Sequence, residues 1–438
     1  MADVPDELVL DALHPLQVVD VRAEAPRHLV QRARQVLEFC SSGLHLNAAV
    51  EIAFIDPLSG PFAATGTNGL HQFQFAADQL VNANGGVLDG QKFEVIGFDN
   101  KISPKESLIQ LQVAIDQGVR FIAQGNSSGV ANALTEAVDK HNRRNPDSRV
   151  LFLNYAAVDP ALTNDKCNFW HFRFDANADI KMDALTDVIA ADDGIKKIYV
   201  IGQDYSFGKA VAAAAERNLS EKRPDIEIVG NELHPIGKVK DFTPYARKIV
   251  ASEADAVITG NWGADMLGLG KSIIENGFDG PIYTYYAAGS GITGAFSETG
   301  KGVIRLVGEG QTNPPASDEA SAYYKAFKAK YPDGNIDQSR ITNTIGMLAQ
   351  AIEDAGTSTD VVAVANALSG MEYDSMWGST IYMRPQDHQA IQDIHIHAHT
   401  DEGVTFDYDN SGYGVVVEST VDMAAMDSPT TCKMKPPS

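Results

Sequence analysis

The pentapeptide G-N-S-S-G, residues 125–129, is the segment whose residue types and spacing come nearest to a known chemistry. It matches the G-x-S-x-G turn that exposes a nucleophilic serine between a strand and a helix. A serine hydrolase also needs an acid and a histidine as partners, and no residue of either type is marked out for that role. The hydroxyls and N–H groups of Asn126, Ser127 and Ser128 at a helix N-terminus equally suit a carboxylate ligand, or simple capping by Ser127. We favour binding or capping over catalysis.

Three histidines, His395, His397 and His399, alternate along the stretch I-H-I-H-A-H-T. On a strand they would share one face and imitate a metal site, but a spacing of about 6.7 Å per two residues strains coordination of one ion by all three. We expect a half-exposed strand face with no metal. No H-E-x-x-H motif and no glycine-rich phosphate fingerprint occurs, so we expect no catalytic residue and no cofactor.

Glycine-rich loops with aromatic residues recur elsewhere in the chain. They include D-P-L-S-G-P-F-A-A-T-G (56–66), N-Y-A-A-V-D-P (154–160), G-Q-D-Y-S-F-G (202–208) and G-N-W-G (260–263). An aromatic side chain on such a loop has no core to justify it, so Tyr205, Phe207, Trp262 and Tyr286 together favour a ligand pocket. Packing between strands or lobes explains any one of them equally well.

The elements that must position these loops are short apolar strands alternating with amphipathic helices, as a parallel sheet with crossover helices requires. One unit is expected to have strands at 49–55, 93–98, 120–123 and 150–154, and a second unit strands at 198–201, 226–229, 256–259 and 282–285. A helix should begin at Ser103-Pro104, with Ser103 as its N-cap. Each chemically interesting loop follows a strand, where ligands bind in open α/β sheets.

Length and charge restrict the function further. The 438 residues exceed the roughly 250–300 at which one hydrophobic core stops growing, so two lobes are expected. The net charge of −23 repels phosphate backbones, so nucleic acid is excluded as a partner. No apolar run approaches the ~20 residues of a membrane-spanning helix.

The first 46 residues differ from the rest and are expected to lie outside the core. They carry no secretory signal, because Met1–Glu7 opens acidic and no long apolar stretch follows. Either the protein stays in the cytoplasm or the natural start differs from Met1. Of the three cysteines, Cys167 and Cys432 either pair and staple the C-terminal tail, in an oxidising compartment, or are two free thiols.

Six motifs in order carry a family likeness. They are I-A-F-I-D-P-L-S-G-P-F-A-A-T-G, N-A-N-G-G-V-L-D-G, N-S-S-G, A-A-V-D-P-A-L-T, D-Y-S-F-G and M-R-P-Q-D-H-Q. Together they resemble the type I periplasmic solute-binding proteins of the branched-chain amino acid ABC transporter family, over about residues 48–438. The resemblance implies two Rossmann-like, doubly wound lobes joined by crossover strands. It also implies capture of a small ligand by hinge closure, an ABC permease as membrane partner, a periplasmic location and pairing of Cys167 with Cys432.

The resemblance also implies lobe boundaries and site residues. Lobe 1 is expected to comprise residues 47–173 and 313–388, and lobe 2 residues 174–312 and 389–438. The ligand carboxylate is expected at Asn126, Ser127 and Ser128. The remaining expected contacts are Thr65, Ala156, Val158, Tyr205, Phe207, Trp262 and Tyr286.

One departure from the family pattern concerns the ligand. Members that bind amino acids pair the ligand ammonium with an acidic residue, at a position that aligns here with Tyr286 or Ala287. Burying an unpaired ammonium is costly, so a hydrophobic carboxylate or an amide fits better than leucine, unless Asp204 or Asp265 substitutes. The function expected is a receptor for a small hydrophobic carboxylate or amino acid. The alternative is a cytoplasmic sensor of the same fold that regulates a protein partner.

Overall fold

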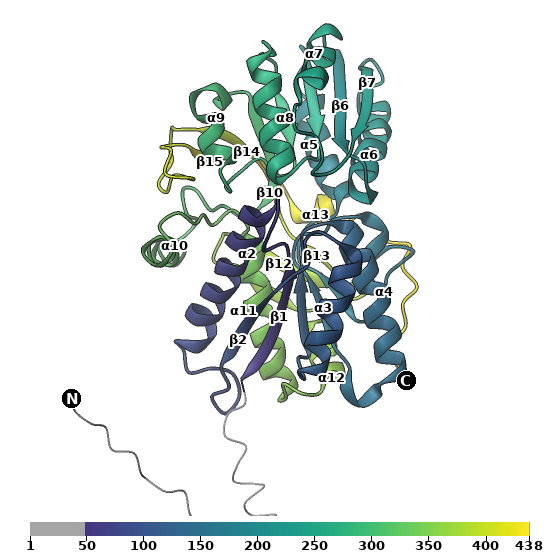
Figure 1. Cartoon of the computed structure of the whole chain (residues 1–438), viewed down its shortest axis with the longest axis vertical. Coiled ribbons are helices and arrows are strands. Elements are labelled where there is room, and N and C mark those ends of the chain that lie inside the picture. Colours follow the sequence, from purple (N-terminus) through teal and green to yellow (C-terminus); the bar gives the residue numbers. More distant parts are fainter. Residues whose placement is uncertain (1–48, 438) are drawn as a thin grey trace, which may run out of the picture. The chain divides into compact units, whose positions relative to one another are not determined.

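The computed structural model describes residues 49–437, which form two α/β lobes, each built on its own sheet (Figure 1). The expected N-terminal segment 1–46 and Cys40 lie outside the described residues. The fold predicted from the sequence is confirmed: both sheets are mainly parallel and have helices on both faces.

The first lobe contains an eight-stranded sheet in the order β11-β12-β13-β5-β4-β3-β1-β2. Its strands are β1 (Val50–Asp56), β2 (Phe93–Asp99), β3 (Phe121–Gln124), β4 (Leu151–Asn154), β5 (His171–Arg173), β11 (Glu372–Asp374), β12 (Thr380–Arg384) and β13 (Gln389–Ile391). Its helices are α2 (Ala63–Ala76), continued by a π-helical turn (Ala77–Asn82), α3 (Pro104–Asp116), α4 (Ser128–Arg144), α11 (Ser339–Ala355) and α12 (Val361–Leu368). Short 3₁₀ turns cover Pro146–Ser148 and Pro160–Thr163.

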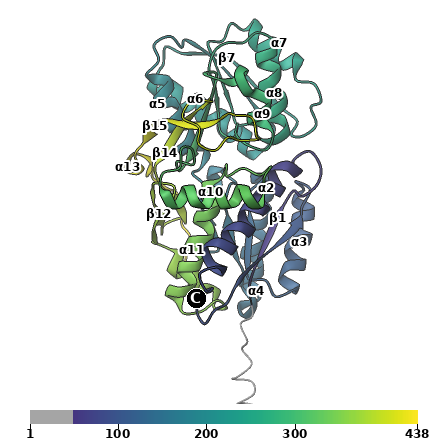
Figure 2. The ribbon, with the colours of Figure 1, turned by 90° about the vertical axis from the view of Figure 1, so that its left-hand side faces the viewer.

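The second lobe contains a seven-stranded sheet in the order β15-β14-β10-β9-β8-β6-β7. Its strands are β6 (Lys197–Gln203), β7 (Glu227–His234), β8 (Ala256–Thr259), β9 (Ile282–Thr284), β10 (Ile304–Glu309), β14 (Ile394–Thr400) and β15 (Gly414–Val421). Its helices are α5 (Ala178–Ala190), α6 (Ser206–Lys222), α7 (Thr243–Ala251), α8 (Gly263–Glu275) and α9 (Ile292–Gly300). Helix α10 (Asp318–Lys330) joins the lobes, and the short α13 (Met423–Met426) lies beside them (Figures 1 and 2).

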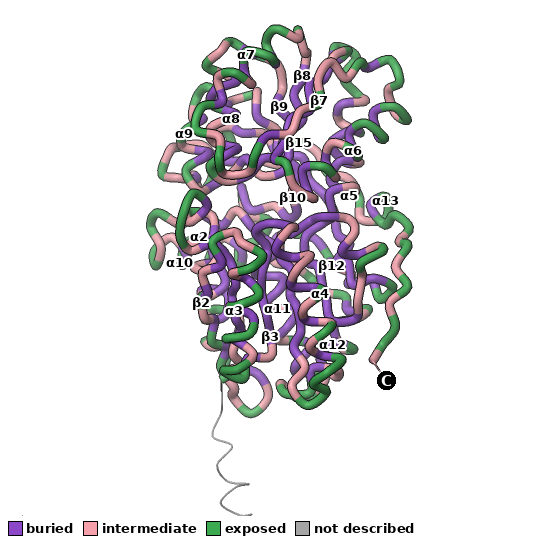
Figure 3. Tube along the Cα trace, turned by 45° about the vertical axis from the view of Figure 1, so that its right-hand side comes forward, coloured by how far each residue is buried: buried purple, intermediate pink, exposed green. Residues whose placement is uncertain are grey.

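Local sequence explains how these elements begin and why they stay buried. Helix α3 begins as predicted, with Ser103 Oγ accepting a hydrogen bond from Glu106 N (3.3 Å) and Pro104 in the first turn. The strand sequences F-I-A-Q and L-F-L-N of β3 and β4 are buried at every residue, because helices cover both faces of the sheet (Figure 3).

The chain passes between the lobes several times. One passage follows β5, a second follows β10, and a third lies between β13 and β14. The third falls slightly later than expected, because residues 389–391 pair with β5 and β12 of the first sheet. After α13 the tail returns to the first lobe, where Arg384 Nη1 donates to Asp427 Oδ1 (2.6 Å). The sequence had placed that tail with the second lobe.

The histidine-rich strand β14 is buried on both faces, so the expected half-exposed face is wrong. His395, His397 and His399 are 7%, 4% and 0% exposed, because helices α5 and α9 pack on β14. His399 Nε2 bonds to the carbonyl of Ser297 (2.8 Å). Burial lowers the pKa of His397 to about 4, so this ring is neutral. No group of three or more potential metal ligands occurs among residues 49–437.

Candidate ligand-binding site

A cavity lies between the lobes, at the carboxyl ends of strands from both sheets. Its volume is about 80 Å³, which is several times the roughly 10–15 Å³ that one water molecule needs on the same measure. All ten residues predicted for the site line this one cavity. They are Thr65, Asn126, Ser127, Ser128, Ala156, Val158, Tyr205, Phe207, Trp262 and Tyr286.

The N-terminus of α4 supplies a polar end. Ser127 caps the helix in a left-handed conformation (φ 79°), a strained backbone that costs about 1–2 kcal/mol in a residue other than glycine. Its side chain makes no capping hydrogen bond, so simple capping does not account for it. The N–H groups of Ser127, Ser128 and Gly129 donate to no residue in the described part of the chain. These three donors at the positive end of a helix can hold an anion.

The loop before α4 is held in place by Asp56, at the end of β1. Its carboxylate accepts hydrogen bonds from Gly125 N (3.1 Å), Asn126 N (3.0 Å) and Tyr155 Oη (2.6 Å). Burial raises the pKa of Asp56 to about 7, although these hydrogen bonds oppose the shift. Gly125 is needed here, because a Cβ at this position would lie 2.7 Å from the Tyr155 ring. Asp56 therefore positions Ser127 without lining the cavity itself.

Aromatic residues of the second lobe form an apolar wall opposite this end. Phe207, in the first turn of α6, packs edge-on against Tyr285, with ring centroids 5.4 Å apart, and at a tilt against Tyr286, with ring centroids 5.9 Å apart. Trp262, just before α8, donates from Nε1 to Tyr205 Oη (2.8 Å). The hydrogen bond fixes the indole plane, which gives a ligand a rigid surface to pack against.

Phe62 links the two lobes beside Trp262, a residue of the cavity wall. It belongs to the first lobe, yet its ring packs on Trp262 of the second lobe, with centroids 4.3 Å apart, and is only 4% exposed. It fits beside two glycines, since a Cβ at Gly237 or Gly263 would come within 2.8 Å or 2.7 Å of the ring. Sequence reasoning missed Phe62, because a residue beside Gly60-Pro61 reads as part of a turn.

Tyr286 also connects the lobes, at the point where the family pattern has an acid. Its hydroxyl lies 3.3 Å from the carbonyl oxygen of Ala156 and 3.2 Å from Asp175 Oδ2. The Ala156 N–H donates to Asn154 Oδ1 (3.3 Å), so both main-chain groups of Ala156 have partners within the protein. Ala156 therefore presents mainly its methyl group to the cavity.

Neither acid suggested as a substitute lines the cavity. Asp265 is buried and accepts hydrogen bonds from Gln203 Nε2 (2.8 Å) and Gly237 N (2.8 Å). Asp204 is exposed and forms an ion pair with Lys209 (3.2 Å). Both carboxylates are engaged within the second lobe.

A buried group of charges at the hinge was not predicted. Lys181 Nζ lies 2.6 Å from Asp175 and 3.2 Å from Glu309, and Arg340 lies 3.2 Å and 3.6 Å from the same two acids. Burial raises the pKa of Asp175 to about 7, whereas the pKa of Glu309 is lowered because Lys181 and Arg340 outweigh the effect of burial. The charges of these two acids and two bases cancel. Arg340 and Glu309 also line the cavity, together with Asp337.

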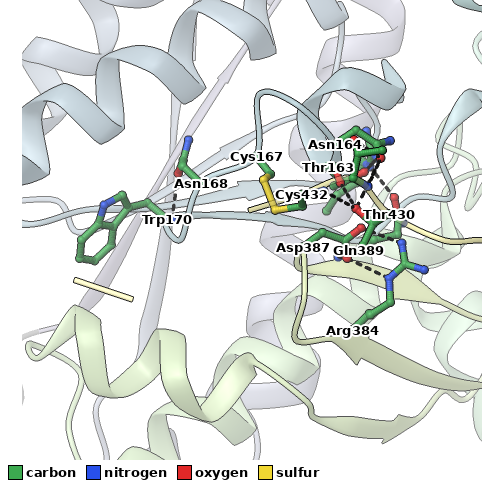
Figure 4. The surroundings of a disulfide bond; sticks show 12 residues. Thr163, Asn164, Cys167, Asn168, Trp170, Arg384, Asp387, Gln389, Thr430 and Cys432 are labelled. Atoms are coloured by element: carbon green, nitrogen blue, oxygen red, sulfur yellow. Dashed lines mark hydrogen bonds and ion pairs between the residues drawn. A yellow bond between two sulfur atoms is a disulfide. The ribbon is translucent and has the colours of Figure 1, made fainter. Parts of the chain in front are cut away.

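Cys167 and Cys432 form a disulfide, with Cα atoms 5.8 Å apart (Figure 4). Thr430 Oγ1 donates to the carbonyl of Thr163 (2.8 Å), and Thr431 N donates to Asn164 Oδ1 (2.9 Å). The tail is thus bound to the first lobe covalently and by hydrogen bonds, as the hypothesis of a stapled tail required.

A family model described as periplasmic binding protein matches residues 49–401. The chain belongs to this family. It is 32% identical to Leu/Ile/Val-binding protein homolog 4 of Brucella abortus (strain 2308) over 349 residues, which cover 78% of this chain and 82% of the relative.

Solved structures of the periplasmic binding protein family show the same fold. The leucine-, isoleucine-, valine-, threonine- and alanine-binding protein of Brucella ovis, in its closed conformation, has a TM-score of 0.77 and 28% identity over 89% of this chain and 100% of that one. An ABC transporter solute-binding protein from Rhodopseudomonas palustris HaA2, in complex with p-hydroxybenzoic acid, has a TM-score of 0.73 and 18% identity over 86% and 98% of the two chains.

Membership of the periplasmic binding protein family decides between the function classes. Proteins of this family bind small solutes for ABC transporters and are not enzymes, so this chain is a solute-binding receptor and Ser127 is not a hydrolase nucleophile. Within residues 49–437, no helix is both long and apolar enough to cross a membrane.

Proposed function

We propose that this receptor captures a small hydrophobic carboxylate without an α-ammonium group, closes its lobes over it, and passes it to an ABC permease. The carboxylate is held by the N–H groups of residues 127–129 and the Ser127 hydroxyl. The observation that carries the proposal is the set of three N–H donors at the start of α4 that have no partner among residues 49–437. Tyr205, Phe207 and Trp262 cover the apolar part of the ligand.

The surroundings of Tyr286 argue against an α-amino acid. An ammonium group beside the carboxylate needs an acidic partner, and the position where the family pattern has an acid holds Tyr286, whose hydroxyl lies against the Ala156 carbonyl and Asp175 Oδ2. Asp204 and Asp265 are engaged elsewhere. An unpaired buried ammonium costs several kcal/mol, which is enough to reverse a preference for leucine.

The two moving bodies in this proposal are defined by the sheets. Residues 49–173 and 313–391 form the first body, and residues 174–312 and 392–426 form the second. The tail from Asp427 belongs with the first body, because the disulfide attaches it there.

We place the receptor in the periplasm. Members of this family are periplasmic, and the Cys167–Cys432 disulfide fits an oxidising compartment. The same two features favour this location over a cytoplasmic sensor of the same fold. The receptor role also implies a membrane permease of the ABC type as the binding partner.

Isothermal titration calorimetry with leucine, phenylalanine and 4-hydroxybenzoate tests the ligand class. We expect 4-hydroxybenzoate to bind at least about tenfold more tightly than either amino acid, which corresponds to about 1.4 kcal/mol. Mass spectrometry of small molecules released by denaturing the purified protein gives an independent identification. Tight binding of leucine, or recovery of a branched-chain amino acid, would overturn the proposal.

A further inference from the structure

The cavity extends beyond the proposed carboxylate end towards α2. In the first sheet β1 lies next to β3, so the loop and helix that follow β1 flank the N-terminus of α4. Here the wall is completed by residues from the β9–α9 region, β10, β14, β15 and the segment before α11. The apolar members are Ile292, Leu306 and Val415, and polar ones are Ser290, Asp337 and His397.

Asp337 has one carboxylate oxygen with partners and one without. Its Oδ1 accepts hydrogen bonds from Asn68 Nδ2 (3.0 Å) and Gln72 Nε2 (2.8 Å), both on α2. Its Oδ2 receives no hydrogen bond from any residue between 49 and 437. Gly289 of the second lobe approaches it so closely that a Cβ there would lie 2.6 Å from Oδ2. This oxygen therefore lies where the two lobes meet, on a residue that lines the cavity.

Another polar atom in the same part of the wall is buried without a hydrogen-bond partner among the described residues. It is Ser290 Oγ, next to Gly289. Burying a polar group without a partner costs roughly 1–3 kcal/mol, so unmatched atoms along one wall of a cavity indicate a group that arrives with the ligand.

The charge balance points to the kind of group. The hinge charges Lys181, Arg340, Asp175 and Glu309 pair with one another. Asp337 adds a third acid, and it forms no ion pair with any basic residue in the described part of the chain. Burial raises the pKa of Asp337 to about 6, so at neutral pH it is an ionised acceptor that lacks a matching donor.

We propose that Asp337, through Oδ2 and assisted by Ser290, is a specificity-determining residue that accepts a hydrogen bond from the ligand. The donor is a hydroxyl or protonated amine on a part of the ligand remote from its carboxylate. The assignment rests on the proposed function and narrows it: the ligand class is a hydrophobic carboxylate with a distal hydrogen-bond donor. A hydroxyl and a protonated amine would both donate a hydrogen bond to Asp337 Oδ2, and the experiment below distinguishes between them.

Calorimetry of the full chain with benzoate, 4-hydroxybenzoate and 4-(aminomethyl)benzoate provides the test. Wild type should bind at least one donor-bearing compound about tenfold or more tightly than benzoate, since hydrogen bonds to charged groups contribute about 1.5–3 kcal/mol. Preference for the hydroxyl or the aminomethyl compound identifies the donor. In Asp337→Asn, which keeps an acceptor for Asn68 and Gln72, the ratio of dissociation constants should fall to near one.

Asp354→Asn, an exposed change on α11 of the same lobe, is the matched control and should keep the wild-type ratio. Carboxylates that bind with the same ratio in wild type and Asp337→Asn would overturn the role of Asp337 and leave the carboxylate site standing. If wild type binds none of the three compounds, the proposed function and this assignment both fail.

Discussion

Ser127 combines a strained backbone with a hydroxyl that makes no hydrogen bond to another described residue. A left-handed serine persists only where its surroundings fix it, and Asp56 does so by holding the preceding two residues through their N–H groups. A residue that caps a helix for stability alone would bond its side chain back to the first turn.

Replacing this hydroxyl should weaken binding without weakening the fold. In Ser127→Ala the carboxylate loses one charge-assisted donor while the N–H groups remain, so we expect the dissociation constant to rise about tenfold or more. Calorimetry with the best carboxylate ligand measures the change, and Ser220→Ala, at an exposed position of α6, serves as control. An unchanged affinity would show that only the main chain holds the ligand.

At the scale of elements, a glycine near the start of the first crossover helix of each lobe packs against a backbone carbonyl oxygen. A Cβ at Gly66 would lie 1.8 Å from the carbonyl oxygen of Pro57, and one at Gly208 would lie 1.9 Å from that of Gln203. The helices α2 and α6 therefore pack directly on the ends of β1 and β6. This close approach brings the first turn of each helix, with Thr65 and Phe207, to the cavity.

A methyl group at Gly208 should consequently displace α6. We expect Gly208→Ala to lower the free energy of unfolding by several kcal/mol, as overpacking against backbone does. Gly129→Ala is the matched substitution in the first turn of α4, where the nearest atom is Ser127 Oγ at 3.5 Å, and should change stability by less than about 1 kcal/mol. Urea denaturation measures both; equal effects would refute the close-packing explanation.

Periodicity and caps predicted most elements, because these signals are local. Ser103-Pro104 marked the start of α3, and a serine pair after an apolar strand marked α4. Other features depend on contacts between distant segments. Arg340 begins a helix and Glu309 ends a strand, and nothing near either residue shows that they meet at a hinge. The burial of His397 was missed because it depends on what covers β14, and alternation alone does not tell a covered face from an open one.

Considered as a whole molecule, the receptor is held closed by contacts that belong to neither lobe alone. The Phe62 ring packs against the core of the second lobe, although the Phe62 backbone lies in the first lobe. Opening the cavity must pull this ring from between Gly237 and Gly263 and expose it to water. Exposing a phenylalanine costs roughly 1.5–3 kcal/mol, so Phe62 biases the molecule towards closure.

Phe62→Ala should therefore weaken ligand binding about tenfold to a hundredfold, chiefly through faster release. Stopped-flow measurement of the dissociation rate tests this, and Phe62→Leu, which keeps most of the apolar volume, should retain most of the affinity. Release at the wild-type rate in Phe62→Ala would mean that the Phe62 ring does not stabilise the closed state.

The Cys167–Cys432 bond gives the molecule a covalent topology different from that of a linear chain. The two cysteines are 265 positions apart in the sequence, so the bond closes a ring that contains the entire second lobe together with α10, α11 and α12. The exposed turn at 401–403 lies on this ring. A protease that cuts such a turn opens the ring but divides nothing, because both new ends stay attached through sulfur. While the bond is oxidised, the receptor can lose a peptide bond at that turn and keep both lobes in one molecule.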